Sequence, residues 1–246
     1  MNQSTQRVAI ITGASRGIGA AVAQRLARDG HVVIINYARQ QGEADALVSR
    51  IEQAGGRALS AQGDVSDPAT FTKLFDRADE AFGGVDVLVN NAGIMNLSSL
   101  ADSSDDLFDR QMAINLKGTF NGMREAARRL RNGGSIVNFS TSVVGLRLET
   151  YGVYAATKAA VETLTAILAK ELRGRSINVN AVAPGPTGTD LFLQGKPQEV
   201  IDRMAKMAPL ERLGTPEDIA AAVAFLAGPD GSWINGQVLR ANGGLI

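Results

Sequence analysis

The chain has 246 residues, with 25 basic side chains against 25 acidic ones, one histidine and no cysteine. A balanced charge creates no field of one sign that would attract nucleic acid or an anionic membrane. The lack of cysteine excludes disulfides and thiol catalysis, and a single histidine excludes a metal site made of several histidines, so we expect no bound metal. That histidine, His31, stands at the start of an apolar run, which favours a structural role.

The N-terminal residues 1–7 are polar and contain no apolar stretch typical of a secretory signal. No apolar run elsewhere reaches the length needed to cross a bilayer. A composition without cysteine fits a reducing compartment. We therefore expect a cytoplasmic protein that does not contact membranes.

Short β-branched runs alternate with longer segments of helical spacing along the chain. The runs occupy residues 8–11, 32–35, 85–89, 136–139 and 177–182. Continuous apolar strands separated by helices predict a parallel sheet that is covered on both faces. Because no linker, repeat or low-complexity tract interrupts the alternation, we predict one doubly wound α/β domain over residues 1–246.

Capping residues mark the predicted helix boundaries. The first helix is predicted over residues 17–29 and is followed by a glycine. Asp67 followed by Pro68 predicts the start of another helix, which a pair of glycines at 83–84 ends. The residues Thr-Pro-Glu-Asp at 215–218 predict a capped helix that ends at residues 228–229.

Residues 186–213 interrupt this alternation. The segment contains three prolines and mixes apolar with charged side chains. It follows the carboxyl end of a strand, where open α/β sheets bind their ligands, so we predict a substrate lid. The alternative is a surface excursion that packs only on itself.

A glycine-rich loop, residues 12–19, follows the first predicted strand and opens the first helix. Gly13, Gly17 and Gly19 have the spacing G-x-x-x-G-x-G. Glycines let the backbone turn tightly and approach a phosphate, and a helix N-terminus offers free N–H groups and a positive dipole end. The loop therefore predicts a nucleotide-phosphate site.

The residues after the second predicted strand indicate which dinucleotide binds. An NAD site usually places an acid there for the ribose 2′-hydroxyl, whereas a 2′-phosphate needs a cation. The strand ends in Asn36 and Tyr37 without an acid, and Arg16 and Arg39 lie within reach. The alternative is that both arginines are only solvated, but the pattern favours NADP(H).

Tyr154 and Lys158 lie four residues apart, which places them on one face of a helix. A phenol loses its proton at about pH 10, and a nearby cation lowers that pKa toward the range of a general acid or base. We therefore expect Lys158 to lower the Tyr154 pKa. The same spacing occurs on solvated helix faces, so the pair is interpreted together with the phosphate loop, Asn115 and Ser142.

Taken together, these motifs resemble the short-chain dehydrogenase/reductase family over nearly the whole chain, and most closely its 3-oxoacyl-(acyl-carrier-protein) reductase and sugar-alcohol dehydrogenase branch. The matching pieces are residues 12–19, 64–65, 90–93, Asn115, Ser142, Tyr154 with Lys158, 184–185, 216–220 and 236–237. The resemblance implies a Rossmann fold, NADP(H) as the cofactor and reduction of a ketone to a secondary alcohol.

The resemblance also implies a role for each catalytic candidate. Tyr154 is expected to protonate the carbonyl oxygen while Ser142 donates a hydrogen bond to it. Lys158 is expected to bind the nicotinamide ribose and to lower the Tyr154 pKa, and Asn115 to hold a water that relays protons to Lys158. Ser140 is the alternative to Ser142, and the alternative for Asn115 is a residue that only kinks its helix.

The resemblance places the cofactor contacts in the phosphate loop, at strand ends and near the lid. Asp64 and Val65 are expected at the adenine, and Thr187 and Thr189 at the carboxamide. The full expected set is Gly13, Ser15, Arg16, Gly17, Ile18, Gly19, Asn36, Tyr37, Arg39, Asp64, Val65, Asn91, Ala92, Gly93, Tyr154, Lys158, Pro184, Gly185, Thr187 and Thr189.

Two stretches do not follow the family pattern. Asn242 stands before two glycines where many relatives carry an acid, in a region that often takes part in subunit packing. Residues 146–150, on the substrate side, match no pattern that we can assign. These residues therefore do not indicate the substrate.

The sequence leaves two carbonyl substrates open. A 3-oxoacyl thioester on an acyl carrier protein would need a basic docking patch, and five arginines are candidates for one: Arg128, Arg129, Arg131, Arg173 and Arg175. A free ketone or sugar alcohol would need no patch, and the apolar lid slightly favours an acyl group or another hydrophobic carbonyl. A non-catalytic NADP(H)-sensing module is the alternative of another class, because a fold alone confers no activity.

Small side chains are frequent on the helices that lead to Arg131 and run through residues 153–172. They allow helices to approach closely, and relatives pair these helices across two-fold axes. The resemblance therefore implies a homotetramer. The alternative is that the alanines pack only on the sheet of their own chain.

Overall fold

The computed structural model describes residues 6–246, and these residues form one 7-stranded parallel sheet with the strand order β3-β2-β1-β4-β5-β6-β7. The strands are β1 (Val8–Ile11), β2 (Val32–Tyr37), β3 (Arg57–Gln62), β4 (Val87–Asn90), β5 (Ser135–Phe139), β6 (Asn178–Pro184) and β7 (Val238–Ala241). The chain order reverses between β1 and β4, and open α/β sheets bind ligands beside such a switch point. The doubly wound α/β fold predicted from the sequence is confirmed.

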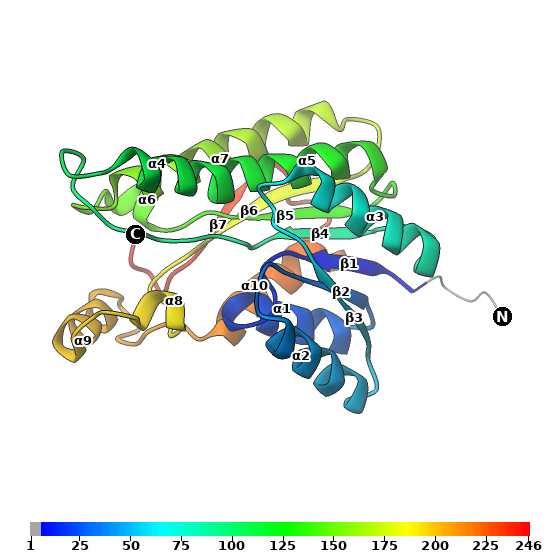
Figure 1. Cartoon of the computed structure of the whole chain (residues 1–246), viewed down its shortest axis with the longest axis horizontal. Helices are drawn as coiled ribbons and strands as arrows, with labels where there is room; N and C mark the ends of the chain where they lie inside the picture. Colours follow the sequence, from blue (N-terminus) through cyan, green and yellow to red (C-terminus); the bar gives the residue numbers. More distant parts are fainter. Residues whose placement is uncertain (1–5) are drawn as a thin grey trace.

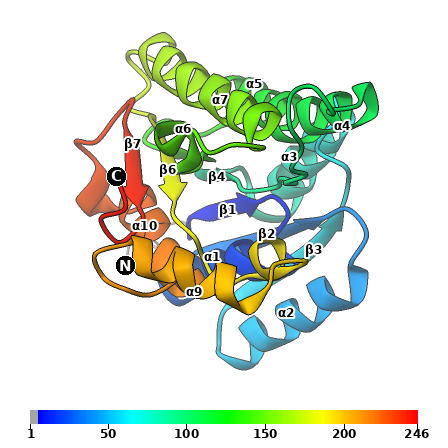
Figure 2. The ribbon, with the colours of Figure 1, turned by 90° about the vertical axis from the view of Figure 1, so that its left-hand side faces the viewer.

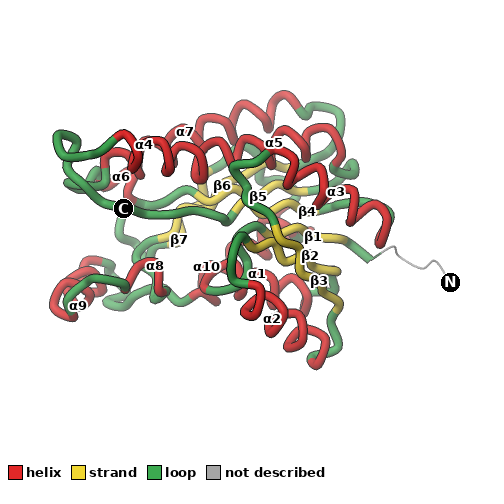
Figure 3. The backbone as a smooth tube through the Cα atoms, in the orientation of Figure 1, coloured by secondary structure: helices red, strands yellow, loops and turns green. Residues whose placement is uncertain are grey.

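Helices cover both faces of the sheet (Figure 1). The upper layer in that view contains α3 (Pro68–Phe82), α4 (Asp105–Gln111), α5 (Gly118–Arg129) and α7 (Gly152–Glu171). The lower layer contains α1 (Gly17–Arg28), α2 (Gln41–Gln53) and α10 (Pro216–Ala227). Figure 3 shows the strands enclosed between these two helical layers.

Each face of the sheet has its own buried apolar cluster. On one face, Leu26 of α1, Leu47 of α2 and Val223 of α10 pack against the strands. On the other face, Phe71 and Phe75 of α3 pack against them. Burial on both faces is the reason that the inner strands are continuously apolar in sequence.

The predicted helix caps are present. The Asp67 carboxylate accepts the Ala69 N–H at 3.0 Å, and Gly83 ends α3 with a φ of 77°. At α10, the Thr215 hydroxyl accepts the Asp218 N–H at 3.2 Å while the Asp218 carboxylate accepts the Thr215 N–H at 2.8 Å. These reciprocal bonds form the capping box that the sequence predicted.

Both edge strands, β3 and β7, are absent from the strands predicted by apolar runs. β3 has the sequence RALSAQ and its side chains are mostly part-exposed, so it lacks the continuous apolar character of the inner strands. β7 is likewise only part-buried. The inner strands β2 and β6 extend further than predicted, to Tyr37 and Pro184.

Short elements gather at the carboxyl edge of the sheet, which faces the viewer in Figure 2. They include α6 (Val143–Leu146), α8 (Asp190–Leu193) and α9 (Gln198–Met207). A π-helix, η1 (Met112–Lys117), joins α4 to α5, and a short 3-10 turn, η2 (Pro229–Gly231), follows α10. Among residues 6–246, no helix is both long enough and apolar enough to cross a membrane.

Candidate active site

The phosphate loop lies beside the switch point, between the carboxyl end of β1 and the start of α1. Gly13 has a φ of 60°, and a Cβ on it would lie 2.9 Å from Ala92 Cα. A Cβ on Gly19 would lie 2.7 Å from the Gly13 carbonyl oxygen. Arg16 caps α1 without a side-chain hydrogen bond, so its side chain leaves the first-turn N–H groups open. This geometry fits an anion at the helix N-terminus.

Thr12 and Asn91 hold this loop against the loop after β4. The Thr12 hydroxyl accepts the N–H groups of Asn91 and Ala92, each at 3.1 Å. The Asn91 amide donates to the carbonyl oxygens of Thr12 and Gly13 at 2.9 and 3.0 Å. Thr12 was not among the predicted site residues, although the motif contains it.

Asn36 and Tyr37, predicted to contact the cofactor, turn their side chains into the protein. The buried Asn36 amide donates to the Gly63 carbonyl at 3.0 Å and accepts the Gly13 N–H at 3.4 Å. Tyr37 is buried within the core cluster. Asn36 therefore stabilises the phosphate loop, and its side chain is not free to bind a ribose.

The two predicted cations of the ribose pocket remain accessible. Arg39 is exposed, and the Arg16 side chain is 58% exposed. One Arg16 guanidinium nitrogen lies 3.8 Å from a carboxylate oxygen of Asp190, at the start of α8. A phosphate that binds Arg16 would compete with this contact.

Asp64 and Val65 lie at the predicted adenine side of the site. The Asp64 carboxylate accepts the N–H and the hydroxyl of Ser66 at 2.9 and 2.8 Å, which fixes a tight turn. Val65 is buried so close to Gly118 that a Cβ there would lie 2.7 Å from Val65 Cγ2. The turn presents Asp64 to solvent, and its contact with adenine remains a prediction.

A cavity at the carboxyl edge of the sheet brings three of the predicted catalytic residues together. Ser142 follows β5, whereas Tyr154 and Lys158 lie on α7, and all three line this cavity. Its apolar wall includes Ile94, Met95, Leu146, Leu148, Leu191, Phe192 and Met204. Ser140 also lines it, but its hydroxyl donates to Glu162 at 2.5 Å. This contact favours Ser142 over Ser140 as the serine available to a substrate.

The electrostatics of Tyr154 differ from the expectation. Burial raises the pKa of Tyr154 to about 12, and the neighbouring Thr141 side chain only partly opposes this shift. The Lys158 ammonium donates to the Phe139 carbonyl at 2.9 Å and lies 6.0 Å from the centre of the Tyr154 ring. Burial lowers the pKa of Lys158 to about 8. In the protein alone, burial therefore places the Tyr154 pKa above its usual value, and a lowering of this pKa by Lys158 remains a prediction.

Asn115 lies in the π-helix η1, so the helix is distorted where the alternative interpretation placed a kink. Its side-chain oxygen accepts the Ile94 N–H at 2.8 Å, and its amide donates to the Ile94 carbonyl at 2.9 Å. A Cβ on Gly93 would lie 3.3 Å from the Asn115 side-chain oxygen and 3.6 Å from Lys158 Nζ. Asn115 thus holds the loop that borders Lys158, and the water relay remains a prediction.

Comparison with known proteins identifies the family. A family model described as enoyl-(acyl carrier protein) reductase matches residues 13–246. A short-chain type dehydrogenase/reductase of Picea abies is 46% identical over 250 residues, which cover 98% of this chain and 92% of the relative. The chain belongs to the short-chain dehydrogenase/reductase family.

Other members of the short-chain dehydrogenase/reductase family are also similar to this chain over almost its full length. An NADPH-dependent aldehyde reductase-like protein of Arabidopsis thaliana, named as chloroplastic, is 42% identical over 98% of this chain and 94% of its own. The structure of a short chain dehydrogenase from Burkholderia cenocepacia in complex with NADP has a TM-score of 0.92 and 40% identity, covering 98% of both chains. The resemblance inferred from the motifs is confirmed.

In this short-chain dehydrogenase/reductase, the predicted lid lies next to the cavity. Leu191 and Phe192 of α8 and Met204 of α9 form part of the cavity wall. At the base of the segment, Gly188 N–H donates to the Gly214 carbonyl and Gly214 N–H donates to the Pro186 carbonyl, each at 2.9 Å. The segment therefore leaves and rejoins the body at one point, and its movement as a lid remains a prediction.

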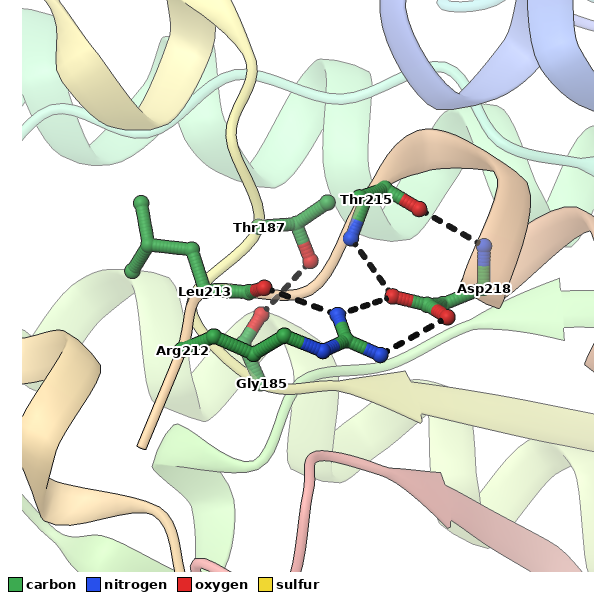
Figure 4. Close-up of polar contacts among 6 residues, drawn as sticks. All are labelled: Gly185, Thr187, Arg212, Leu213, Thr215 and Asp218. Atoms are coloured by element: carbon green, nitrogen blue, oxygen red, sulfur yellow. Dashed lines mark hydrogen bonds and ion pairs between the residues drawn. The ribbon is translucent and has the colours of Figure 1, made fainter. Parts of the chain in front are cut away.

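An ion pair stabilises the point where the lid segment joins the body of the protein (Figure 4). The Arg212 guanidinium donates to both carboxylate oxygens of Asp218, at 2.5 and 3.1 Å, and to the Leu213 carbonyl at 3.0 Å. The hydrogen bonds from Arg212, and to a lesser extent the one from the Thr215 N–H, lower the pKa of Asp218 to about 2. Where the chain enters the lid segment, the Thr187 hydroxyl donates to the Gly185 carbonyl at 2.9 Å.

Two further residues at the site were not predicted as site residues. The Asn242 amide donates to the Ser142 hydroxyl at 3.0 Å across a separation of 100 residues. The Tyr151 ring lies edge-on to Tyr154, with their centres 6.4 Å apart, and lines the cavity. The sequence showed that Asn242 departs from the family pattern, but no sequence signal connected this residue to Ser142.

Proposed function

We propose that this protein reduces an apolar ketone or aldehyde to the corresponding alcohol, with NADPH as the hydride donor. The observation that carries the proposal is one cavity with apolar walls into which Ser142, Tyr154 and Lys158 all project. The phosphate loop ends beside this cavity, because Ile18 and Asn91 also line it. A nucleotide on the loop and a carbonyl in the cavity would therefore meet.

The loop and its surroundings fit a phosphorylated dinucleotide. Gly13 and Gly19 let the loop pack closely against itself and against the loop after β4, where a Cβ would collide with the protein, and the N-terminus of α1 favours an anion. Arg16 and Arg39 are accessible cations for a 2′-phosphate, and the second strand ends without an acid that would repel it. When bound, NADPH would supply the hydride. Two similar proteins named with NADPH or NADP support this assignment.

The proposed proton donor is Tyr154. With a pKa of about 12 the phenol stays protonated at neutral pH, which suits a general acid in the direction of reduction. Ser142 would donate a hydrogen bond to the same carbonyl oxygen and stabilise its developing charge. Lys158, with a pKa of about 8, would hold a proton at neutral pH and bind the ribose hydroxyls.

The arginines considered for an acyl carrier protein favour a free carbonyl as the substrate. Arg129 binds Asp76, Asp79 and Glu125 at 2.6–3.1 Å, and Arg131 binds Asp86 at 2.9 Å. Arg175 donates to the carbonyl oxygens of Ala127 and Leu130. These arginines also precede β5 and β6, at the edge of the sheet opposite the cavity. A 3-oxoacyl thioester is the second candidate, because the cavity wall is apolar.

The test is NADPH oxidation with short acetoacetyl thioesters, apolar free ketones and aldehydes, and polar sugars, each repeated with NADH. We expect turnover of apolar carbonyls with NADPH, and its loss in Tyr154→Phe. Phe225→Tyr, a matched exchange at an exposed side chain of α10, serves as the control and should retain turnover. NADPH binding without turnover of any carbonyl would instead support the sensing module.

We also propose that the chain forms a homotetramer in the cytoplasm. Phe120 of α5 and Ile167 of α7 are 42% and 46% exposed, on the helices that the sequence assigned to subunit contacts. An assembled tetramer would cover such side chains. Fractionation of the cells that produce the protein tests the compartment, and its native mass tests the assembly.

A further inference from the structure

The hydrogen bonds of Ser142 point to a residue that controls its proton. A serine hydroxyl has one proton to donate and two lone pairs that accept. In the structure the Ser142 hydroxyl donates to the Ala183 carbonyl at 3.2 Å and accepts from the Asn242 amide at 3.0 Å. The buried Ser142 also lines the cavity, where a substrate carbonyl would be the second acceptor for its proton.

The orientation of the Asn242 amide follows from its other partners. Its side-chain oxygen accepts the N–H groups of Gly244 and Leu245, at 3.1 and 3.3 Å. Both partners are donors, so the oxygen has to face them and the NH₂ group has to face Ser142. Gly185 permits this approach, because a Cβ there would lie 2.8 Å from the Asn242 Cβ.

We infer that Asn242 is a positioning residue that keeps the Ser142 proton available for the substrate carbonyl. The amide donates into one lone pair of the Ser142 oxygen, so the hydroxyl proton cannot turn toward residue 242. Its remaining acceptors are the Ala183 carbonyl, through a long hydrogen bond, and the substrate. Donation into the oxygen also polarises the hydroxyl and strengthens it as a donor.

The inference rests on the proposed function, and it distinguishes an amide from an acid at this position. A carboxylate at residue 242 would still accept the N–H groups of Gly244 and Leu245. Its second oxygen would lie where the NH₂ group now faces Ser142 and would accept the serine proton through a charge-assisted hydrogen bond. Ser142 would then present a lone pair to the substrate, and the developing oxyanion would lose a donor.

The test compares Asn242→Asp with Asn242→Ala. Asn242→Asp keeps the turn and reverses the hydrogen bond to Ser142, whereas Asn242→Ala loses the turn and leaves Ser142 with its other acceptors. We expect kcat to fall about tenfold or more in Asn242→Asp and only about threefold in Asn242→Ala. The melting temperature should have the opposite order, with Asn242→Ala the lower. The affinity for NADPH should not change in either variant.

The control is Asn235→Asp, which makes the same chemical change before β7, away from the cavity. Asn235 uses only its side-chain oxygen, which accepts the Val179 N–H at 2.8 Å, and a carboxylate keeps this bond. Asn235→Asp should retain the kcat of the unchanged protein. A structural role of Asn242 predicts that Asn242→Ala is the less active of the two variants, and this order would overturn the inference.

A double-mutant cycle gives an independent test that does not need Asn242→Asp to fold. In a Ser142→Ala background, Asn242→Ala should have no further effect on kcat, because the residue acts through Ser142. An undiminished effect in that background would reject the positioning role. If the unchanged protein reduces no carbonyl with NADPH, the proposed function itself fails, so the two failures are distinguishable.

Discussion

Replacing Arg16 by alanine is expected to weaken the binding of NADPH far more than that of NADH. Arg16 stands at the N-terminus of α1 with its side chain 58% exposed, and it makes no side-chain cap to the helix. Its removal should therefore leave the phosphate loop intact. The lost interaction is the one with the 2′-phosphate, which NADH does not have.

The size of the effect follows from two competing contacts. A hydrogen bond to a charged group contributes about 1.5–3 kcal/mol. Against it stands the contact of Arg16 with Asp190 at 3.8 Å, with side chains 58% and 79% exposed. Two unit charges at this distance in water attract by about 1 kcal/mol, and exposed pairs measure that much or less. The net loss is about 0.5–3 kcal/mol, or roughly 2- to 150-fold in NADPH affinity.

The assay is calorimetric titration of the ligand-free protein with NADPH and with NADH. Arg28→Ala is the matched control, because Arg28 is an exposed arginine in the last turn of the same helix. Asp190→Asn removes the competing contact and should tighten NADPH binding by at most about fivefold. Equal weakening of NADPH and NADH in Arg16→Ala, or no weakening of either, would refute the role of Arg16.

Three other properties can be measured directly. Burial lowers the pKa of His31 below its usual 6.5. As the pH falls, His31 is therefore protonated in the unfolded chain before it is protonated in the folded protein. The free energy of unfolding in urea should therefore fall as the pH drops below 6.5, and His31→Leu should flatten this slope; an unchanged slope would mean that other groups cause it. Asp218→Asn should lower the melting temperature and raise the KM for the carbonyl without changing NADPH affinity, because it weakens the point where the lid segment joins the body. An unchanged KM would mean that the Arg212–Asp218 ion pair does not support the lid. Light scattering should give four times the 25.8 kDa chain mass, and a monomer mass would reject the tetramer.

Much of the fold was predictable because its signals are local. The inner strands are buried on both faces and are therefore continuously apolar, and caps such as Asp67 and Thr215 mark helix starts within a few residues. The edge strands β3 and β7 were missed because an edge strand is stabilised by its neighbour's backbone. Such pairing requires no apolar run.

The candidate site divides in the same way. Tyr154 and Lys158 are recognisable because one helix turn brings them together, and the phosphate loop because its glycines are close in the chain. In the protein alone the Tyr154 pKa lies above its usual value, whereas the spacing to Lys158 suggested a lower one. Spacing shows a nearby cation, but not how far the surrounding side chains exclude water from the phenol.

The sequence by itself determined the alternation of strands and helices, the phosphate loop and the pairing of Tyr154 with Lys158. Only the tertiary structure decided that Asn36 turns inward, that Arg16 meets the lid and that Asn242 donates to Ser142. Parallel strands bring their carboxyl ends to one edge of the sheet, whatever their distance along the chain. Ser142 follows β5 and Asn242 follows β7, the two strands that flank β6, and this strand order is a property of the folded sheet.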